Sequence, residues 1–357
     1  MIVLSNFLIF DKIKVAGILL NNRIVVSPMC QYSAKNGCPT EWHYAHLGSL
    51  ATSGAGMLTI ESTAVNMNGR ITHADLCLHT KKQYFSMKKL FLHLKKISNI
   101  PICLQIAHAG RKGSANIPWI KKNSALNKNQ TGWKTYSASS IRKDKGWPNP
   151  IKLSQKKIKS IIQDYLKTAK LAKKIGFDAI EIHMAHGYLL HQFISPISNK
   201  RKDIYGGNLK NRLRLPTLIL KNIRKIWPKN KILGARITAT DHLKRGININ
   251  EAISFVKQLE KVGLDYVCIS SGGILTKTNL NPNKKAFRLK LAEKIKKKTK
   301  ILVRVSGNLN YPNLLKKIIG KKIDFVAIAR PFLANPRWIY NNFNVKNIPK
   351  QISRGFK

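Results

Sequence analysis

The chain has 357 residues and a hydrophobic fraction of 43%, enough to bury a large core in one domain or two. Its apolar runs fall short of the ~20 residues of a membrane-spanning helix, so we expect no membrane partner. The formal net charge of +50 comes from lysines spread over almost every helical segment, whereas a nucleic-acid-binding protein gathers its basic side chains on one face. A nucleic-acid partner is therefore not expected. A codon bias toward Lys, Asn and Ile suffices to explain the charge, and a functional role for it stays open.

The five cysteines are scattered, odd in number and without a CxxC pair: Cys30, Cys38, Cys77, Cys103 and Cys268. This pattern is typical of free thiols in a reducing compartment and predicts a cytoplasmic protein. The apolar N-terminus lacks a leading basic region and is interrupted by Asp11, Lys12 and Lys14. We expect it to fold as a strand or hairpin rather than to serve as a signal peptide.

Eight short apolar runs alternate with longer amphipathic segments. The runs expected as strands are Arg23–Val26, Met57–Glu61, Ile102–Ala107, Ala179–His183, Ile232–Ile237, Tyr266–Ser270, Ile301–Val305 and Phe325–Ala329. The expected helices are Trp42–Ser53, Lys81–Ile97, Ser154–Ile175, Leu209–Ile226, Asn250–Val262, Ala286–Lys298 and Tyr311–Ile319, with a last helix after Pro331. This alternation predicts an α/β fold, a (β/α)8 TIM barrel that forms a single domain over residues 1–357. The rival fold, a doubly wound open sheet, usually carries a GxGxxG motif, which the sequence lacks.

Polar side chains follow the predicted strands, at the end where a barrel places its chemistry. His183, His186 and Tyr188 follow the fourth strand, and residues 113–150 follow the third strand as an irregular segment that we expect to act as a lid. Gly307 and Arg330, after the seventh and eighth strands, fit the usual phosphate site of a barrel. Gln105 and Arg236 suit the edges of a planar ring. The residues therefore predict a site for a large, phosphorylated ligand.

Several motifs resemble the old yellow enzyme family almost from end to end. They are SPMCQYSA (27–34), GRITHADL (69–76), QIAHAGRK (105–112), FDAIEIHMAHGYLLHQFISPISNKRKDIYGG (177–207), SSGG (270–273) and AIARPFLANP (327–336). Cys30, Tyr32 and the C-terminal QISRGF (351–356) are similar to the bacterial NADPH dehydrogenase-like ene-reductases. The resemblance implies a (β/α)8 barrel with noncovalent FMN and NADPH as reductant. The implied reaction is reduction of the C=C bond of enones, with quinones and nitro compounds as further substrates.

The resemblance also implies a role for each site residue. The residues expected to contact FMN are Ser27, Pro28, Met29, Cys30, Ser62, Gln105, Arg236, Gly307, Ala329 and Arg330. His183 and His186 would hold the substrate carbonyl oxygen, with Tyr32 beside it. A hydride from FMN N5 would reach the β-carbon and a proton from Tyr188 the α-carbon. Residues 340–357 would form a tail whose Arg354 reaches the neighbouring subunit's site, which predicts a homodimer or homotetramer.

Three departures and several alternatives accompany this interpretation. Ser62 replaces a usual Ala. Ala329 replaces a usual Gly and would crowd the phosphate turn if the backbone there needs a positive φ. The turn VRVSGNL (303–309) is less rich in glycine than the common pattern. Cys30 is either a buried thiol or a thiol that tunes the flavin. The charges after the third strand, Arg111 and Lys112, are either solvated or face the lid.

The remaining histidines and the basic charge allow other assignments. His43 and His46 are assigned to packing or subunit contacts. No metal site is expected, because His183 and His186 lack a third ligand. The alternative function is a tRNA dihydrouridine synthase-like FMN barrel, which the basic charge would suit.

Overall fold

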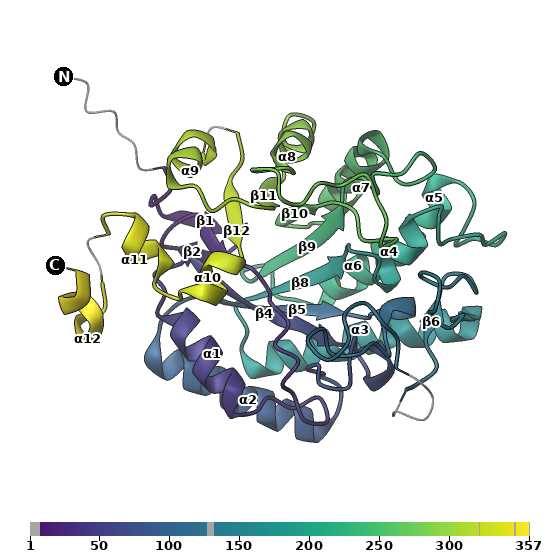
Figure 1. The fold of residues 1–357 in the computed structure, drawn as a ribbon, viewed down its shortest axis with the longest axis horizontal. Coiled ribbons are helices and arrows are strands. Elements are labelled where there is room, and N and C mark those ends of the chain that lie inside the picture. The colour runs from purple at the N-terminus through teal and green to yellow at the C-terminus, as the bar shows by residue number, and fades with distance from the viewer. Residues whose placement is uncertain (1–7, 127–131, 321, 346–347, 357) are drawn as a thin grey trace.

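The computed structural model describes residues 8–126, 132–320, 322–345 and 348–356. Eight parallel strands close into a barrel in the order β10-β11-β12-β3-β4-β5-β8-β9, and helices surround it (Figure 1). The barrel strands are β3 (Ile24–Val26), β4 (Met57–Ala64), β5 (Ile102–Ala107), β8 (Ala179–Met184), β9 (Ile232–Thr238), β10 (Tyr266–Ser270), β11 (Leu302–Ser306) and β12 (Phe325–Ile328). The predicted (β/α)8 barrel is confirmed.

Helices connect these strands and also follow the last one. They are α1 (Glu41–Ala51), α2 (Lys81–Ile97), α3 (Gln155–Ile175), α4 (Leu189–Ile194), α5 (Leu209–Arg212), α6 (Arg214–Ile226), α7 (Ile249–Lys261), α8 (Leu289–Lys296), α9 (Pro312–Ile318), α10 (Arg330–Ala334), α11 (Trp338–Asn342) and α12 (Lys350–Ser353). The longest helix, α3, has the predicted caps, because the Ser154 side chain accepts from Lys157 N and Gly176 ends the helix at φ 112°. Within the described residues, no helix is both long and apolar enough to cross a membrane.

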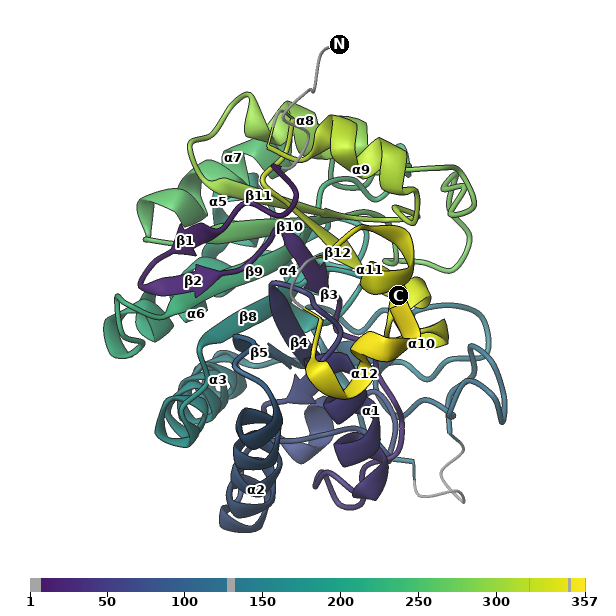
Figure 2. The same cartoon turned by 90° about the vertical axis from the view of Figure 1, so that its left-hand side faces the viewer.

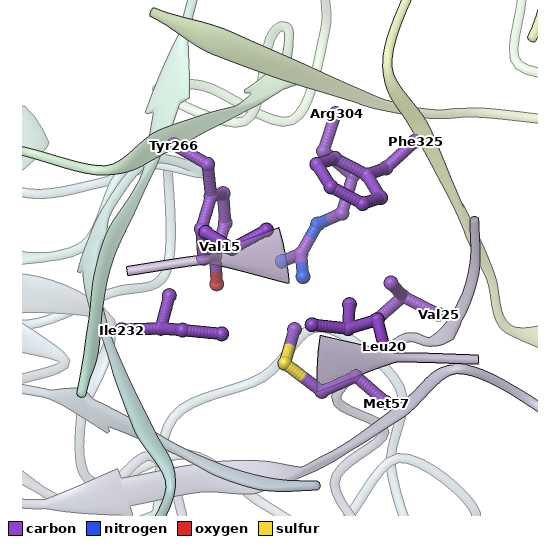
Figure 3. Close-up of a pocket in the computed structure, with 8 residues that line it drawn as sticks. All are labelled: Val15, Leu20, Val25, Met57, Ile232, Tyr266, Arg304 and Phe325. Carbon is purple, nitrogen blue, oxygen red and sulfur yellow. The ribbon is translucent and has the colours of Figure 1, made fainter. Parts of the chain in front are cut away.

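A short antiparallel hairpin closes the amino-terminal end of the barrel. Its strands are β1 (Ile13–Val15) and β2 (Ile18–Leu20), and Figure 2 shows them lying across this end. Val15 and Leu20 are buried against the first residues of several barrel strands. A small apolar cavity lies between the hairpin and the strands, lined by Val15, Leu20, Val25, Met57, Ile232, Tyr266, Arg304 and Phe325 (Figure 3). The predicted N-terminal hairpin is confirmed, and it acts as a hydrophobic plug.

A buried polar network crosses the middle of the barrel. Glu181 forms an ion pair with Arg304 and accepts a hydrogen bond from the Tyr266 hydroxyl at 2.8 Å. Gln105 Nε2 donates to the other carboxylate oxygen of Glu181 at 2.6 Å. Gly234 leaves room for this network, because a Cβ there would lie 2.1 Å from the Tyr266 ring. The interior therefore changes from apolar at the hairpin to charged halfway along the strands.

The observed boundaries differ from the predicted ones in a few places. The predicted helix Leu209–Ile226 is broken at Leu213 into α5 and α6, and the predicted helix Ala286–Lys298 shortens to α8. The segment after β5 contains two short strands, β6 (Tyr136–Ser137) and β7 (Ile151–Lys152), which pair with each other. Near the C-terminus the Phe356 ring packs on Tyr340, with ring centroids 5.5 Å apart.

Candidate active site

The loop after β8 holds His183, His186 and Tyr188 in a tightly constrained backbone. His186 and Gly187 both have a positive φ, of 57° and 73°. A Cβ at Gly187 would lie 2.2 Å from the carbonyl oxygen of Gly273, so only glycine fits there. The turn therefore fixes where the two flanking side chains point.

Residues of α4 and of the segment after β9 hold this turn in place. His191 Nδ1 accepts a hydrogen bond from Gly187 N at 2.8 Å, and His191 Nε2 lies 3.0 Å from Asp241 Oδ1. Ser195 Oγ donates to the second carboxylate oxygen of Asp241 at 2.7 Å. Burial would raise the pKa of Asp241, but His191 and these hydrogen bonds lower it overall. The charged Asp241 therefore anchors His191, which holds the Gly187 turn.

The two histidines predicted to act together do lie together. His183 Nε2 and His186 Nδ1 are 3.2 Å apart, and His186 Nε2 contacts the Ser270 hydroxyl. His183 Nδ1 accepts from Ala185 N at 3.2 Å, which leaves the proton of a neutral His183 on Nε2. His183 Nε2 therefore donates to His186 Nδ1, and the two rings lie side by side at the end of β8.

Both imidazoles are neutral at physiological pH. Burial is the largest cause that lowers the pKa of His183 and of His186 well below its ordinary value, and the nearby Arg236 lowers both further. Neutral imidazoles serve as N–H donors rather than as acids in this pH range. The pair is therefore suited to hold an oxygen atom without giving up a proton.

Tyr188 stands next to this pair at the start of α4. Its ring contacts the His183 ring in a T-shaped arrangement, with centroids 4.7 Å apart. Burial raises the pKa of Tyr188 well above its ordinary value, so the phenol keeps its proton. Lys112 Nζ lies 5.1 Å from the centre of the same ring and donates to the His186 carbonyl oxygen at 2.8 Å. Tyr188 is therefore a protonated hydroxyl beside the amine of Lys112, whose pKa burial lowers to about 7.

Arg236, Gln105 and Gly307 are brought to the same end of the barrel from three strands. Arg236 Nη2 donates to Ser306 Oγ at 3.1 Å, whereas its buried Nε has no hydrogen-bond partner in the described part of the chain. Gln105 uses its amide nitrogen on Glu181, which leaves the amide oxygen for another group. Gly307, directly after β11, has φ 125°. These residues form a cradle in which Arg236 Nε and the Gln105 amide oxygen are available to a ligand.

The segment after β3 forms another side of the site. Ser27 N donates to the Ile328 carbonyl oxygen at 2.9 Å, and Pro28, Met29 and Cys30 that follow are half-buried. Burial, and then the carboxylate of Glu61, raise the pKa of the Cys30 thiol well above its ordinary value. Cys30 is therefore a neutral thiol and not a nucleophilic thiolate.

Ser62 and Tyr32 are positioned by irregular backbone. The register between β4 and β5 shifts from Ile60 to Thr63, and Ser62 lies inside that irregularity, where a bulge re-aims side chains. Tyr32 has φ 49°, and its ring meets the exposed Trp119 of the segment 113–150 edge-on at 5.7 Å. The segment therefore contacts one of the predicted substrate-binding residues.

The backbone at the end of β12 accommodates Ala329 without crowding. Its φ is −115°, so the backbone does not need glycine there and the expected crowding does not arise. Arg330 begins α10 and its side chain is exposed. Arg354 begins the 3-10 turn that follows α12 near the C-terminus.

Two buried residues, His43 and Arg111, make contacts that the sequence did not predict. His43 is fully buried, which agrees with its assignment to packing. The sequence did not predict that its Nε2 lies 2.9 Å from Glu61 Oε1, where it holds the carboxylate that accepts from Gln31 N. Arg111 is also buried and donates to the carbonyl oxygens of Ile141 and Arg142. Of the two alternatives, Arg111 faces the segment 113–150. Within the described ranges, no three His, Cys, Asp or Glu side chains are placed to hold a metal.

Comparison with known proteins identifies the family. The model of the NADH:flavin oxidoreductase / NADH oxidase family matches residues 8–346. The chain is 34% identical to the NADPH dehydrogenase of Clostridium acetobutylicum, over 98% of this chain and 99% of that protein.

Two solved structures share the fold. One is a 2-naphthoyl-CoA reductase, with a TM-score of 0.84 and 24% identity over 98% of this chain, which spans only 52% of that longer chain. The other is the old yellow enzyme homologue of Zymomonas mobilis, with a TM-score of 0.78 and 21% identity over 96% of this chain and 95% of that one. The chain therefore belongs to the NADH:flavin oxidoreductase / NADH oxidase family, the family of the old yellow enzymes, and is an FMN-dependent oxidoreductase with NADPH as reductant.

Proposed function

We propose that the protein reduces the C=C bond of α,β-unsaturated carbonyl compounds, and also quinones or nitro compounds. One observation carries the proposal: His183 Nε2 and His186 Nδ1 converge within 3.2 Å beside the protonated hydroxyl of Tyr188. A pair of neutral donors next to an acid is what the conversion of an enone to an enolate and then to a ketone requires.

The residues at the carboxyl end of the barrel fit FMN. The buried Nε of Arg236 has no partner among the described residues, and the amide oxygen of Gln105 is turned away from Glu181. A flavin ring offers both acceptors and an N–H donor along one edge, which matches these two side chains. The residues that would hold the cofactor are Ser27, Pro28, Met29, Cys30, Ser62, Gln105, Arg236, Gly307, Ala329 and Arg330. When bound, FMN takes a hydride from NADPH and supplies it to the substrate.

His183 and His186 then hold the carbonyl oxygen and stabilise the negative charge that develops on it. In the free protein, His183 donates to His186, and His186 contacts Ser270. The hydroxyl of Ser270 both donates and accepts, so it suits either tautomer of His186. With Nε2 of His186 accepting from Ser270, Nδ1 carries a proton and both histidines donate to the same oxygen. Each such donor contributes about 3 kcal/mol to the stability of a transition state.

Tyr188 supplies the proton to the α-carbon, and Tyr32 helps to hold the substrate. The high pKa of Tyr188 keeps the phenol protonated until carbanion character develops next to it. The protonated form of Lys112, whose pKa burial lowers to about 7, favours the phenolate that remains after transfer. The proton therefore reaches the substrate from the protein.

The proposal extends to the domain organisation and to the assembly. We regard residues 1–357 as one domain, with the segment 113–150 as a lid, because Trp119 of that segment contacts Tyr32. The tail 340–357 would place Arg354 in the site of a neighbouring subunit, which requires a homodimer or homotetramer. Sedimentation of the wild-type protein and of an Arg354→Ala variant would test this; a monomeric wild-type protein contradicts it.

The experiment that tests the proposed function is an anaerobic titration. The purified protein should be yellow, lose its flavin absorbance on addition of NADPH and regain it on addition of cyclohexenone. Saturated cyclohexanone should leave the absorbance bleached. Reduction by NADPH without reoxidation by any enone, quinone or nitro compound would contradict the proposed substrate class while leaving the family assignment intact.

A further inference from the structure

A second arginine lies beside Arg236 at the turn after β11. Arg288 is half-buried in the segment that leads from β10 to α8. A Cβ built on Gly307 would lie 3.2 Å from Arg288 Nη1, so this guanidinium directly faces the glycine of the turn. Arg236 reaches Ser306, the residue just before it. Two guanidinium groups therefore flank the Ser306–Gly307 turn.

Hydrogen bonds and a ring contact fix the position of Arg288. Arg288 Nε donates to Ser271 Oγ at 3.1 Å, and Nη2 donates to the Ser271 carbonyl oxygen at 3.2 Å. The guanidinium also packs over the Phe287 ring, 4.4 Å from its centre. These contacts leave Nη1 without a hydrogen bond in the described part of the chain.

The segment that carries Arg288 is itself fastened to the β11 turn. Ala286 N donates to the Asn308 carbonyl oxygen at 3.0 Å, and Asn308 Nδ2 donates to the Asn283 carbonyl oxygen at 2.8 Å. These two hydrogen bonds set the segment and the turn at a constant separation. Arg288 is therefore presented to the turn as a preorganised donor.

No carboxylate balances these two charges among the residues that the structure describes. Neither Arg236 nor Arg288 takes part in any of the ion pairs there, although Arg304, Arg201 and Arg212 in the same barrel are all paired. Burial, and next the charge of Arg236, lower the pKa of Arg288 to about 9. A buried and a half-buried cation side by side are costly unless an anion lies between them.

We propose that Arg288 binds the phosphate of FMN, together with the backbone of the turn at Gly307. Guanidinium groups bind phosphate through strong, charge-assisted hydrogen bonds, and the free Nη1 supplies such a donor. The inference needs only the binding of FMN and does not depend on which alkene the enzyme reduces. It adds to the site a residue that lies outside every motif of the sequence.

Riboflavin gives the decisive comparison, because it carries the same ring as FMN without the phosphate. We would measure the affinity of the flavin-free protein for FMN and for riboflavin, by quenching of flavin fluorescence, in the wild type and in Arg288→Met. FMN should bind about 10- to 100-fold more weakly to the variant, the usual effect of losing a hydrogen bond to a charged group. Riboflavin affinity should stay within about twofold. Lys290→Met, which removes an exposed charge two residues further on, is the matched control and should change neither affinity.

Retained riboflavin binding shows at the same time that Arg288→Met is folded. Arg288→Lys keeps the charge and should recover part of the FMN affinity. Equal weakening of both flavins would overturn the proposal, because the loss would then lie in the ring site or the fold. Unchanged FMN affinity would also overturn it and would assign Arg288 to an anionic group of the substrate or of NADPH. Wild-type protein that binds riboflavin as tightly as FMN would show that no phosphate site exists.

Discussion

The two ends of the barrel use the same eight strands for opposite purposes. At the amino-terminal end, the first residues of the strands meet the β1–β2 hairpin around an apolar cavity (Figure 3). The one charged side chain there, Arg304, is paired with Glu181. At the carboxyl end, neither Arg236 nor Arg288 forms an ion pair with any of the residues that the structure describes. The difference shows that a paired buried charge belongs to the architecture, whereas an unpaired one marks a binding site.

The largest expected effect is on catalysis at the carboxyl end. Replacing both His183 and His186 with Ala removes the two donors that hold the carbonyl oxygen, so we expect enone reduction to fall by about 10³-fold or more. The bound flavin, measured by absorbance, should remain, because neither histidine belongs to the cofactor cradle. A double variant that kept full activity with cyclohexenone would eliminate the proposed mechanism.

The ion pair in the middle layer should dominate stability. Arg304→Met leaves the buried carboxylate of Glu181 without its partner, which costs about 3–5 kcal/mol in the free energy of unfolding. Adding Glu181→Gln removes the stranded charge and keeps an acceptor for Tyr266, so the double variant should recover most of this loss. Urea denaturation of the single and double variants measures both effects. If Arg304→Met were as stable as the wild type, the distinction between paired and unpaired charges would fail.

The sequence predicted the barrel strands closely because each is a short apolar run whose residues are buried on both sides. It also predicted the histidine pair, because His183 and His186 are only three residues apart at the end of one strand. It did not predict the contact of Glu181 with Arg304. Those residues lie on β8 and β11, which are not neighbours in the sheet, so only closure of the barrel brings them together.

Other contacts at the site were equally beyond the sequence. His43 and Glu61 pair between a helix and a bulged strand, and Arg288 lies in a connecting segment with no motif. Side-chain alternation along β11 puts Arg304 and Ser306 on one face of the strand, but it does not indicate the partner of either. Long-range polar contacts depend on three-dimensional closure and not on local periodicity.

The hairpin plug should matter for stability and not for chemistry. Leu20→Ala empties a buried position at the amino-terminal end and should cost about 2–5 kcal/mol. Leu19→Ala, at the adjacent position that is 50% exposed, is the matched control and should cost less than about 1 kcal/mol. Enone reduction per bound flavin should be unchanged in both variants. A loss of turnover in a folded Leu20→Ala protein would show that the two ends are not independent.

Tyr188 should contribute less than the histidine pair, because water can replace it in part. Tyr188→Phe removes the hydroxyl and keeps the ring against His183, so we expect enone reduction to slow by about 10- to 100-fold. Quinone reduction requires no proton on carbon and should be nearly unaffected, which makes it an internal control. Equal losses with both substrates, measured under the same NADPH concentration, would indicate that Tyr188 positions the substrate instead of protonating it.

The dependence of stability on pH should also arise at the carboxyl end. His108 follows β5; burial, and then Lys157, lower its pKa to about 3, from an ordinary value near 6.5. Between these two values the unfolded chain binds a proton that the folded protein does not, so the free energy of unfolding falls as the pH drops below about 6.5. One histidine of this kind contributes a slope of about 1.4 kcal/mol per pH unit. His108→Gln should reduce the slope measured by urea denaturation between pH 6.5 and pH 4, with excess FMN held constant. Leu20→Ala, at the other end, adds and removes no group that titrates in this window, and an equal change of slope in that variant would show that acid sensitivity is a property of the whole barrel.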